Sequence, residues 1–410
     1  ADGVNWIKIG DTEKDGKYIL HTKEKIRPVG LSKTRYVCSG DFLLTNSMSF
    51  GRPYILKTDG CIHDGWLVIS NIDTVFNQDY LYYALSSGFM YTTLSLLAAG
   101  STVKNLKSDT VRSVFFPIPP LGEQARMARR LEQLIAFVDA INADKRQFVD
   151  IVNQTKSKIL DLAIRGKLVP QDPADEPASV LLERIRAEKE ELIKQGKIKR
   201  DKKESVIFRG DDNSYYLYNA GNSQIADDIL PYELPDSWCW CTINDVFSIN
   251  PRNHIDDETE VSFVPMPLIA DGFSNHFTCA AKRWKEVKSG FTHFQEGDIG
   301  LAKITPCFEN RKSVVFTSLT NAYGAGTTEL HILRPLSVSI NAEYALWFLK
   351  SERFIQDGVQ SFTGAVGQQR IGRDVVANTF FPLPPIKEQN RIAEMIRMLF
   401  HRLDKIACCL

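Results

Sequence analysis

A fourteen-residue sequence occurs twice in this chain and constrains its fold more than any other feature. FFPIPPLGEQARMA spans residues 115–128 and FFPLPPIKEQNRIA spans residues 380–393, with nine of the fourteen positions identical. The two copies lie 265 residues apart. Chance does not explain similarity of this length, so the chain is predicted to contain two copies of one structural unit.

Weaker similarity extends upstream of both copies. Residues 40–42 (GDF) correspond to residues 297–299 (GDI) at an offset of 257, and residues 80–87 correspond to residues 344–351 at an offset of 264. At these offsets nothing in the first half corresponds to residues 230–257, and the chain does not begin with Met. We therefore expect that the first copy has lost its opening segment by truncation or processing.

Each copy is followed by a predicted long helix. Apolar residues recur there with 4-3-4-3 spacing, which is typical of a coiled coil, whereas a helix that faces its own domain core shows a broader apolar stripe. The first helix is expected to cover about 45 residues, or roughly 65 Å. The simplest packing pairs the two helices along a seam formed by Met127, Leu131, Leu134, Val138 and Ile141 on one helix and by Ile392, Ile396, Leu399, Leu403 and Ile406 on the other.

The repeated units are predicted to be mixed α/β domains. Residues 66–70 (WLVIS) and 313–316 (SVVF) are predicted strands, and residues 80–85 and 344–349 are predicted short helices. Residues 206–228 are polar and are expected to form an irregular loop.

The predicted fold class is therefore α+β. Two similar mixed α/β domains would be joined by two long antiparallel coiled-coil helices with pseudo-two-fold symmetry. The expected segments are 1–120 (first domain), 121–168 (long helix), 169–230 (linker with a short amphipathic helix and a polar loop), 231–385 (second domain) and 386–410 (second, shorter helix).

Motifs of common catalytic and metal sites are absent from the sequence. There is no phosphate-binding G-x-x-x-x-G-K-S/T, no H-E-x-x-H and no C-x-x-C. The acidic residues at 256–260 are expected to form a solvated loop, and the eight cysteines are expected to be reduced thiols. The Pro-Pro pairs, in IPPL and LPPI, are expected to mark helix starts. These absences predict a non-catalytic protein that holds no metal and no cofactor.

Three sequence features together resemble one protein family. The motif F-P-I/L-P-P-I/L-x-E-Q occurs twice before a heptad helix, ILDLAIRGKLVPQDPADEPASVLLERIRAEKE occupies residues 159–190, and LPDSWCW occupies residues 234–240. The chain is similar in these features to the specificity subunit of type I restriction-modification systems.

The resemblance implies a cytoplasmic subunit of a bacterium or archaeon that recognises a bipartite, interrupted target in double-stranded DNA. It also implies two methyltransferase subunits, which use S-adenosylmethionine to methylate adenine, and two motor/nuclease subunits. The two recognised half-sites would lie near one helical turn, or about 10 base pairs, apart.

Polar side chains on loops are best suited to reading the edges of DNA bases. The net charge of zero keeps an alternative open, a duplicated coiled-coil scaffold that does not read DNA. The candidate DNA-binding residues are Thr45, Asn46, Ser47, Ser49, Arg52, Ser101, Thr102, Lys104 and Asn105 in the first unit, and Lys303, Thr305, Asn310, Arg311, Lys312, Tyr323, Thr327, Gln368, Gln369 and Arg370 in the second.

Overall fold

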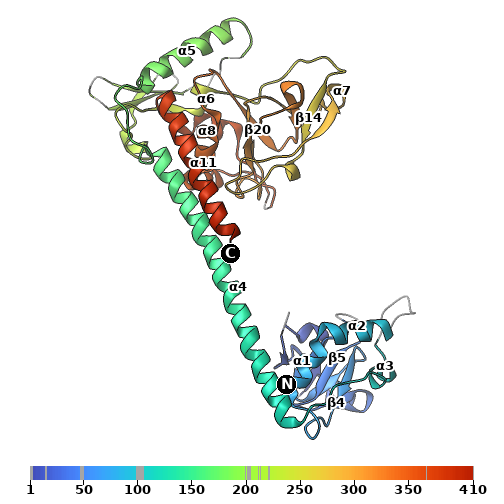
Figure 1. Cartoon of the computed structure of the whole chain (residues 1–410). Coiled ribbons are helices and arrows are strands. Elements are labelled where there is room, and N and C mark those ends of the chain that lie inside the picture. The colour runs from blue at the N-terminus through green and yellow to red at the C-terminus, as the bar shows by residue number, and fades with distance from the viewer. Residues whose placement is uncertain are drawn as a thin grey trace. The chain divides into compact units, whose positions relative to one another are not determined.

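The structure is a computed structural model in which the chain divides into two compact units (Figure 1). Unit 1 comprises residues 1–144 and unit 2 comprises residues 145–410, and the boundary falls within the helix α4 (Leu121–Ile164). The structure describes residues 3–13, 16–46, 50–97, 106–198, 200, 205–210, 212, 214–219, 222–365 and 367–409.

The described residues of unit 1 form two four-stranded sheets, with the strand orders β3-β1-β7-β4 and β2-β6-β5-β8. Three short helices follow the last strand in sequence. The elements are β1 (Val4–Ile7), β2 (Tyr18–Ile19), β3 (Glu24–Ile26), β4 (Arg35–Val37), β5 (Phe42–Thr45), β6 (Pro53–Leu56), β7 (Gly60–Ile62), β8 (Trp66–Ile69), α1 (Gln78–Ser86), α2 (Gly88–Leu97) and α3 (Ser108–Arg112).

Alternating side chains of β5 explain how these elements form layers. Successive residues of a strand point to opposite faces of its sheet. Leu43 packs with Ile7 and Trp66 in the core between the two sheets. Phe42 points the other way and packs with Leu81 of α1 and Leu94 of α2. The second sheet is therefore covered by the first sheet on one face and by helices on the other.

Unit 2 repeats this arrangement. Its sheets have the orders β15-β14-β19-β16 and β13-β20-β17-β18, and β12 pairs with β21. The elements are β12 (Cys239–Thr242), α6 (Ile243–Val246), β13 (Phe247–Ile249), β14 (Glu260–Val264), β15 (Ala280–Arg283), α7 (Trp284–Val287), β16 (Thr292–Gln295), β17 (Ile299–Ala302), β18 (Ser313–Val315), β19 (Tyr323–Gly326), β20 (Leu330–Pro335), α8 (Ala342–Leu349), α9 (Glu352–Gln360), α10 (Arg373–Asn378), β21 (Phe380–Leu383) and α11 (Ile386–Cys408).

The strand orders confirm the duplication predicted from the sequence, except that the edge strand β2 of unit 1 has no counterpart beside β18 in the described sheets of unit 2. The order β3-β1-β7-β4 matches β15-β14-β19-β16, with one parallel pair, β1 with β7 or β14 with β19, in each sheet. The order β6-β5-β8 matches β18-β17-β20. The predicted strands at 66–70 and 313–316 and the predicted helices at 80–85 and 344–349 are also confirmed.

Residues 230–257 of unit 2 supply β12, α6 and β13, for which no counterpart in unit 1 was predicted. β12 pairs with β21, and Trp240 of β12 lies 6.4 Å from Phe380, between ring centroids. The equivalent of Phe380 in unit 1 is Phe115, which is 95% exposed. The described part of unit 1 therefore leaves uncovered an aromatic position that β12 covers in unit 2.

The segment between α4 and β12 corrects one prediction. α5 (Ala178–Lys194) is the expected amphipathic helix, but the irregular loop expected at 206–228 is wrong. This segment forms an antiparallel sheet of β9 (Ser205–Arg209), β10 (Tyr215–Asn219) and β11 (Asn222–Ile225). Ile207 and Leu217 pack against Trp240. A buried face supplied by a distant strand therefore stabilises strands whose local sequence is rich in turn-forming residues.

In unit 2, the C-terminal part of α4 and the 23-residue helix α11 lie side by side and run antiparallel (Figure 1). Lys156 contacts Asp404 near the end of α11, with 2.5 Å between Nζ and Oδ1. Gln171, which follows α4, donates to Glu388 at the start of α11 at 2.6 Å. Leu160 and Ile164 pack with Ile392, Ile396 and Phe400 in the main hydrophobic core.

This pairing corrects the predicted seam. Ile392 and Ile396 are fully buried against α4, but Ile406 is exposed. Because the helices are antiparallel, α11 meets the C-terminal part of α4 rather than the equivalent N-terminal part. The five seam residues predicted on the first helix are 37–53% exposed: Met127, Leu131, Leu134, Val138 and Ile141.

Candidate nucleic-acid interface

Two loops of unit 2 that were predicted to read DNA meet at the end of β17. The backbone N–H of Ile371 donates to the carbonyl O of Lys303 at 3.0 Å, and the N–H of Thr305 donates to the carbonyl O of Gln369 at 3.0 Å. The N–H of Lys303 donates to the carbonyl O of Glu329 at 3.0 Å. The residues around these bonds, with the chain neighbours Gln368 and Arg370, are called the β17 cluster: Lys303, Thr305, Glu329, Gln368, Gln369 and Arg370.

An ion pair lies within the β17 cluster. Nε and Nη2 of Arg370 donate to the two carboxylate oxygens of Glu329, each at 2.9 Å. The hydrogen bond from Arg370 lowers the pKa of Glu329 below its usual value, so this carboxyl is ionised at neutral pH. Sequence reasoning missed Glu329 because it considered donors and amides on loops, and no local pattern links two residues 41 positions apart.

Thr327 lies next to the β17 cluster, whereas Tyr323 belongs to another part of the unit. The Thr327 hydroxyl accepts a hydrogen bond from the N–H of Glu329 at 3.2 Å. Tyr323, at the start of β19, packs against the hydrophobic cluster that contains Val261 and Trp284. The structure therefore separates Tyr323 from the other residues predicted for this loop.

The remaining candidates of unit 2 hold a turn together. Nε of Arg311 donates to the carbonyl O of Lys350 at 3.0 Å, and its guanidinium also pairs with Glu352. Nζ of Lys312 donates to the carbonyl O of Ile269 at 3.1 Å. The carbonyl O of Asn310 accepts from the N–H of Gly272 at 2.8 Å. Partners within the fold engage both cations, and the Arg311 side chain is only 18% exposed, which weakens the prediction that Arg311 reads bases.

A buried lysine fixes the same turn. Nζ of Lys350 donates to the carbonyl oxygens of Gly272 at 2.8 Å and of Arg311 at 2.6 Å. Its side chain is fully buried, and desolvation, with a smaller contribution from Arg311, lowers its pKa to about 7. No sequence signal marked this residue, because a lysine on a helix is ordinarily exposed.

Unit 1 contains a junction equivalent to the one at β17. The N–H of Leu106 donates to the carbonyl O of Asn46 at 2.8 Å. Asn46 and Leu106 are the repeat equivalents of Lys303 and Ile371, at offsets of 257 and 265 residues. One predicted DNA-reading loop of unit 1 follows Asn46 and the other precedes Leu106, so one end of each loop lies at this junction.

The side chains around the unit 1 junction take structural roles. Thr45 is fully buried and its hydroxyl accepts from the N–H of Arg52 at 3.0 Å, so its prediction as a base-reading residue is wrong. Nδ2 of Asn46 donates to the carbonyl O of Asp64 at 2.6 Å. The guanidinium of Arg52 lies over the ring of Tyr54. Six further candidates lie outside the described residues: Ser47, Ser49, Ser101, Thr102, Lys104 and Asn105.

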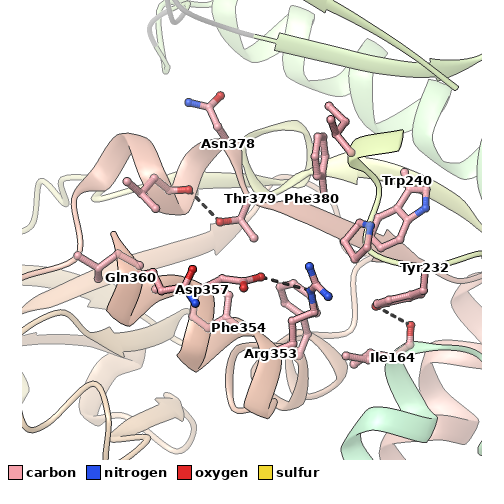
Figure 2. Close-up of a pocket in the computed structure, with 16 residues that line it drawn as sticks. Ile164, Tyr232, Trp240, Arg353, Phe354, Asp357, Gln360, Asn378, Thr379 and Phe380 are labelled. Carbon is pink, nitrogen blue, oxygen red and sulfur yellow. Dashed lines mark hydrogen bonds and ion pairs between the residues drawn. The ribbon is translucent and has the colours of Figure 1, made fainter. Parts of the chain in front are cut away.

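A cavity of about 530 Å³ opens in unit 2 between the end of α4, β12, α9 and α10 (Figure 2). Its lining includes the aromatic residues Trp240, Phe354 and Phe380, and Arg353 pairs with Asp357 at 3.3 Å on α9. None of the predicted DNA-binding residues lines it. The cavity is therefore a feature of the domain–helix junction and is not part of the β17 cluster.

Within the residues that the structure describes there is neither a cluster of metal ligands nor a helix suited to span a membrane. No three His, Cys, Asp or Glu side chains within those ranges come together as a metal-binding group. No described helix is both long and apolar enough to cross a membrane.

The chain is similar to several specificity subunits of type I restriction enzymes. It is 47% identical over 249 residues to the specificity subunits of the type I restriction enzymes EcoAI and EcoEI, both from Escherichia coli. Each match covers 60% of this chain and 39% of the relative. The chain thus spans well under half the length of these two relatives.

Two solved structures share the fold. The HsdS subunit of Thermoanaerobacter tengcongensis aligns with a TM-score of 0.52 over 99% of this chain and 84% of its own, at 16% identity. A chain from a structural study of complex assembly and conformational transition of the type I R-M system aligns with a TM-score of 0.58 over 100% and 86%, also at 16% identity.

The family described as type I restriction modification DNA specificity domain matches residues 2–149 and 235–406, which are the two repeated units with their following helices. The match includes both junctions, Asn46 with Leu106 and Lys303 with Ile371. The chain belongs to this family of type I restriction modification DNA specificity domains.

Proposed function

We propose that this chain is the non-catalytic, sequence-specific DNA-binding subunit of a type I restriction-modification complex. It would recognise a bipartite, interrupted target, with one half read by each unit. The observation that carries the proposal is the repeated junction: in each unit one backbone hydrogen bond, from Leu106 to Asn46 or from Ile371 to Lys303, joins residues at the ends of two polar segments. Base edges are read by polar side chains of this kind, while other contacts position the protein on the phosphates.

Partner subunits would supply the chemistry. We propose that two methyltransferase subunits bind S-adenosylmethionine and methylate adenine, and that two motor/nuclease subunits complete the restriction enzyme in the cytoplasm. The repeat supports two copies of each partner, because a duplicated subunit offers two similar docking surfaces. The rival function, a scaffold without DNA readout, rests on the net charge of zero. Family membership favours DNA readout over the scaffold.

A segment exchange tests the division of labour. Residues 230–381 are replaced by the matching segment of a relative with another target, and methylated adenines are mapped by sequencing in cells that also make the partner subunits. We expect only one half of the methylated sequence to change. The control replaces residues 3–114 and should change only the other half. Changes in both halves after either exchange would contradict the proposal, and so would an absence of sequence-preferring binding in a gel shift.

A further inference from the structure

The pairing of Arg370 with Glu329 leaves part of the guanidinium available. An arginine side chain carries five N–H donors. Three of them are used, two by the carboxylate of Glu329 and one, from Nη1, by the carbonyl O of Gln368 at 2.8 Å. Among the described residues these are all of its acceptors, so one N–H on each terminal nitrogen remains.

Both members of the pair are held by the backbone and yet reach solvent. Arg370 exchanges two backbone hydrogen bonds with Thr363, at 2.9 and 3.1 Å. Glu329 is fixed by its bonds to Thr327 and Lys303. The side chains of Arg370 and Glu329 are 41% and 26% exposed. The guanidinium is therefore oriented before any ligand arrives, which reduces the side-chain entropy lost on binding.

The two unused N–H groups of Arg370 can bind some chemical groups of DNA better than others. In the major groove guanine presents two acceptors, O6 and N7, whereas adenine presents one acceptor and one donor. A phosphate also offers two acceptors, but the carboxylate of Glu329 neutralises Arg370 and repels a second anion at close range. A neutral base with paired acceptors fits this arrangement better than the DNA backbone does.

We propose that Arg370 reads a guanine in the half-site recognised by unit 2, and that Glu329 is the positioning residue that orients it. This inference rests on the proposed function and extends it to one base and one residue pair. Glu329 does not contact the base; it acts by fixing the plane of the guanidinium.

A selection experiment tests the pair. Duplexes from a pool with randomised positions are selected by the full chain in complex with its methyltransferase subunits, using wild type, Arg370→Ala, Arg370→Lys and Glu329→Gln. We expect the wild-type pool to contain a fixed guanine in one half-site. All three variants should lose that preference, by about tenfold or more for Arg370→Ala, and should keep the preference at every other position. Arg353→Gln, which breaks an exposed arginine–carboxylate pair on α9, is the matched control and should select the wild-type sequence.

A modified base provides the second measurement. Replacing the fixed guanine with 7-deazaguanine removes N7 and should weaken wild-type binding but not further weaken binding by Arg370→Ala. Equal weakening of all sequences by Arg370→Ala would show a phosphate contact and overturn the inference. A lower melting temperature for Glu329→Gln with unchanged base preference would show a merely structural role and also overturn it. If wild type selects no sequence, the proposed function itself fails.

Discussion

The side-chain amide of Gln389 accepts a hydrogen bond from the backbone N–H of Asn341 at 2.9 Å, across 48 residues of sequence. Its Nε2 donates to the carbonyl O of Pro384 at 2.9 Å. Gln124 makes the equivalent bonds in unit 1, to the N–H of Asn77 at 2.7 Å and to the carbonyl O of Pro119 at 2.8 Å. The glutamine of the repeated motif therefore ties the start of each long helix to the start of α1 or α8.

Replacing this glutamine should destabilise its unit. Gln389 is fully buried, and Gln389→Leu leaves the N–H of Asn341 and the carbonyl O of Pro384 without partners. We expect the free energy of unfolding of unit 2 to fall by about 2–4 kcal/mol, because each unpaired buried group costs about 1–3 kcal/mol. Urea unfolding measures the loss. Lys387→Ala, an exposed change on the same helical turn, should be nearly neutral, and a similar loss for both variants would contradict the prediction.

Equivalent seam positions should respond differently to a charge. Leu131 and Ile396 occupy the same repeat position, yet they are 37% and 0% exposed. Ile396→Asp places an unpaired carboxylate among Leu160 and Phe400 and should cost more than about 4 kcal/mol. Leu131→Asp should cost less than about 1 kcal/mol in the isolated chain. Thermal unfolding checks both, and equal losses would show that the two positions are equally packed.

Lys350 should make the stability of unit 2 depend on pH above neutrality. Its folded-state pKa of about 7 lies below the ordinary 10.5. Between these values the unfolded chain binds more protons than the folded chain, so this residue makes the free energy of unfolding rise with pH, by up to about 1.4 kcal/mol per pH unit.

The variant Lys350→Met isolates that contribution. It leaves the carbonyl oxygens of Gly272 and Arg311 unpaired at every pH, which adds a constant loss. The difference in stability between wild type and variant should therefore grow as the pH rises from about 7 to about 9. Urea unfolding at several pH values measures it. A difference that stays constant would mean that Lys350 is charged throughout this range.

Arg311 is expected to affect stability and not base preference. Arg311→Ala removes its bonds to the carbonyl O of Lys350 and to Glu352, and should cost about 1–2 kcal/mol. Arg311 has a φ of +56°, which favours glycine, so Arg311→Gly should cost less than Arg311→Ala. Thermal unfolding and selection from randomised duplexes measure the two properties. A changed base preference in these variants would contradict the prediction and show that Arg311 contributes to base recognition.

Features set by local sequence were predictable. The repeated motif, the heptad spacing that follows it and the alternating apolar residues of WLVIS and SVVF act through neighbours a few positions away. They gave the duplication, the long helices, the α+β class and the pairs of loops near Asn46 and Lys303. The heptad spacing predicts that an apolar residue such as Leu134 faces another helix. It does not show which part of the other helix packs there, and Leu134 is in fact exposed.

Contacts between distant segments decided the rest. The sheet of β9, β10 and β11 needs the buried face that Trp240 supplies, and contacts such as Lys156 with Asp404 place α11 against the C-terminal part of α4. Arg311 and Arg370 are both loop arginines in sequence, yet the Arg311 side chain is only 18% exposed beside the carbonyl O of Lys350, whereas the Arg370 side chain is 41% exposed beside Glu329. The availability of a polar side chain depends on partners far away in sequence, so only the tertiary structure determines which residues can read DNA.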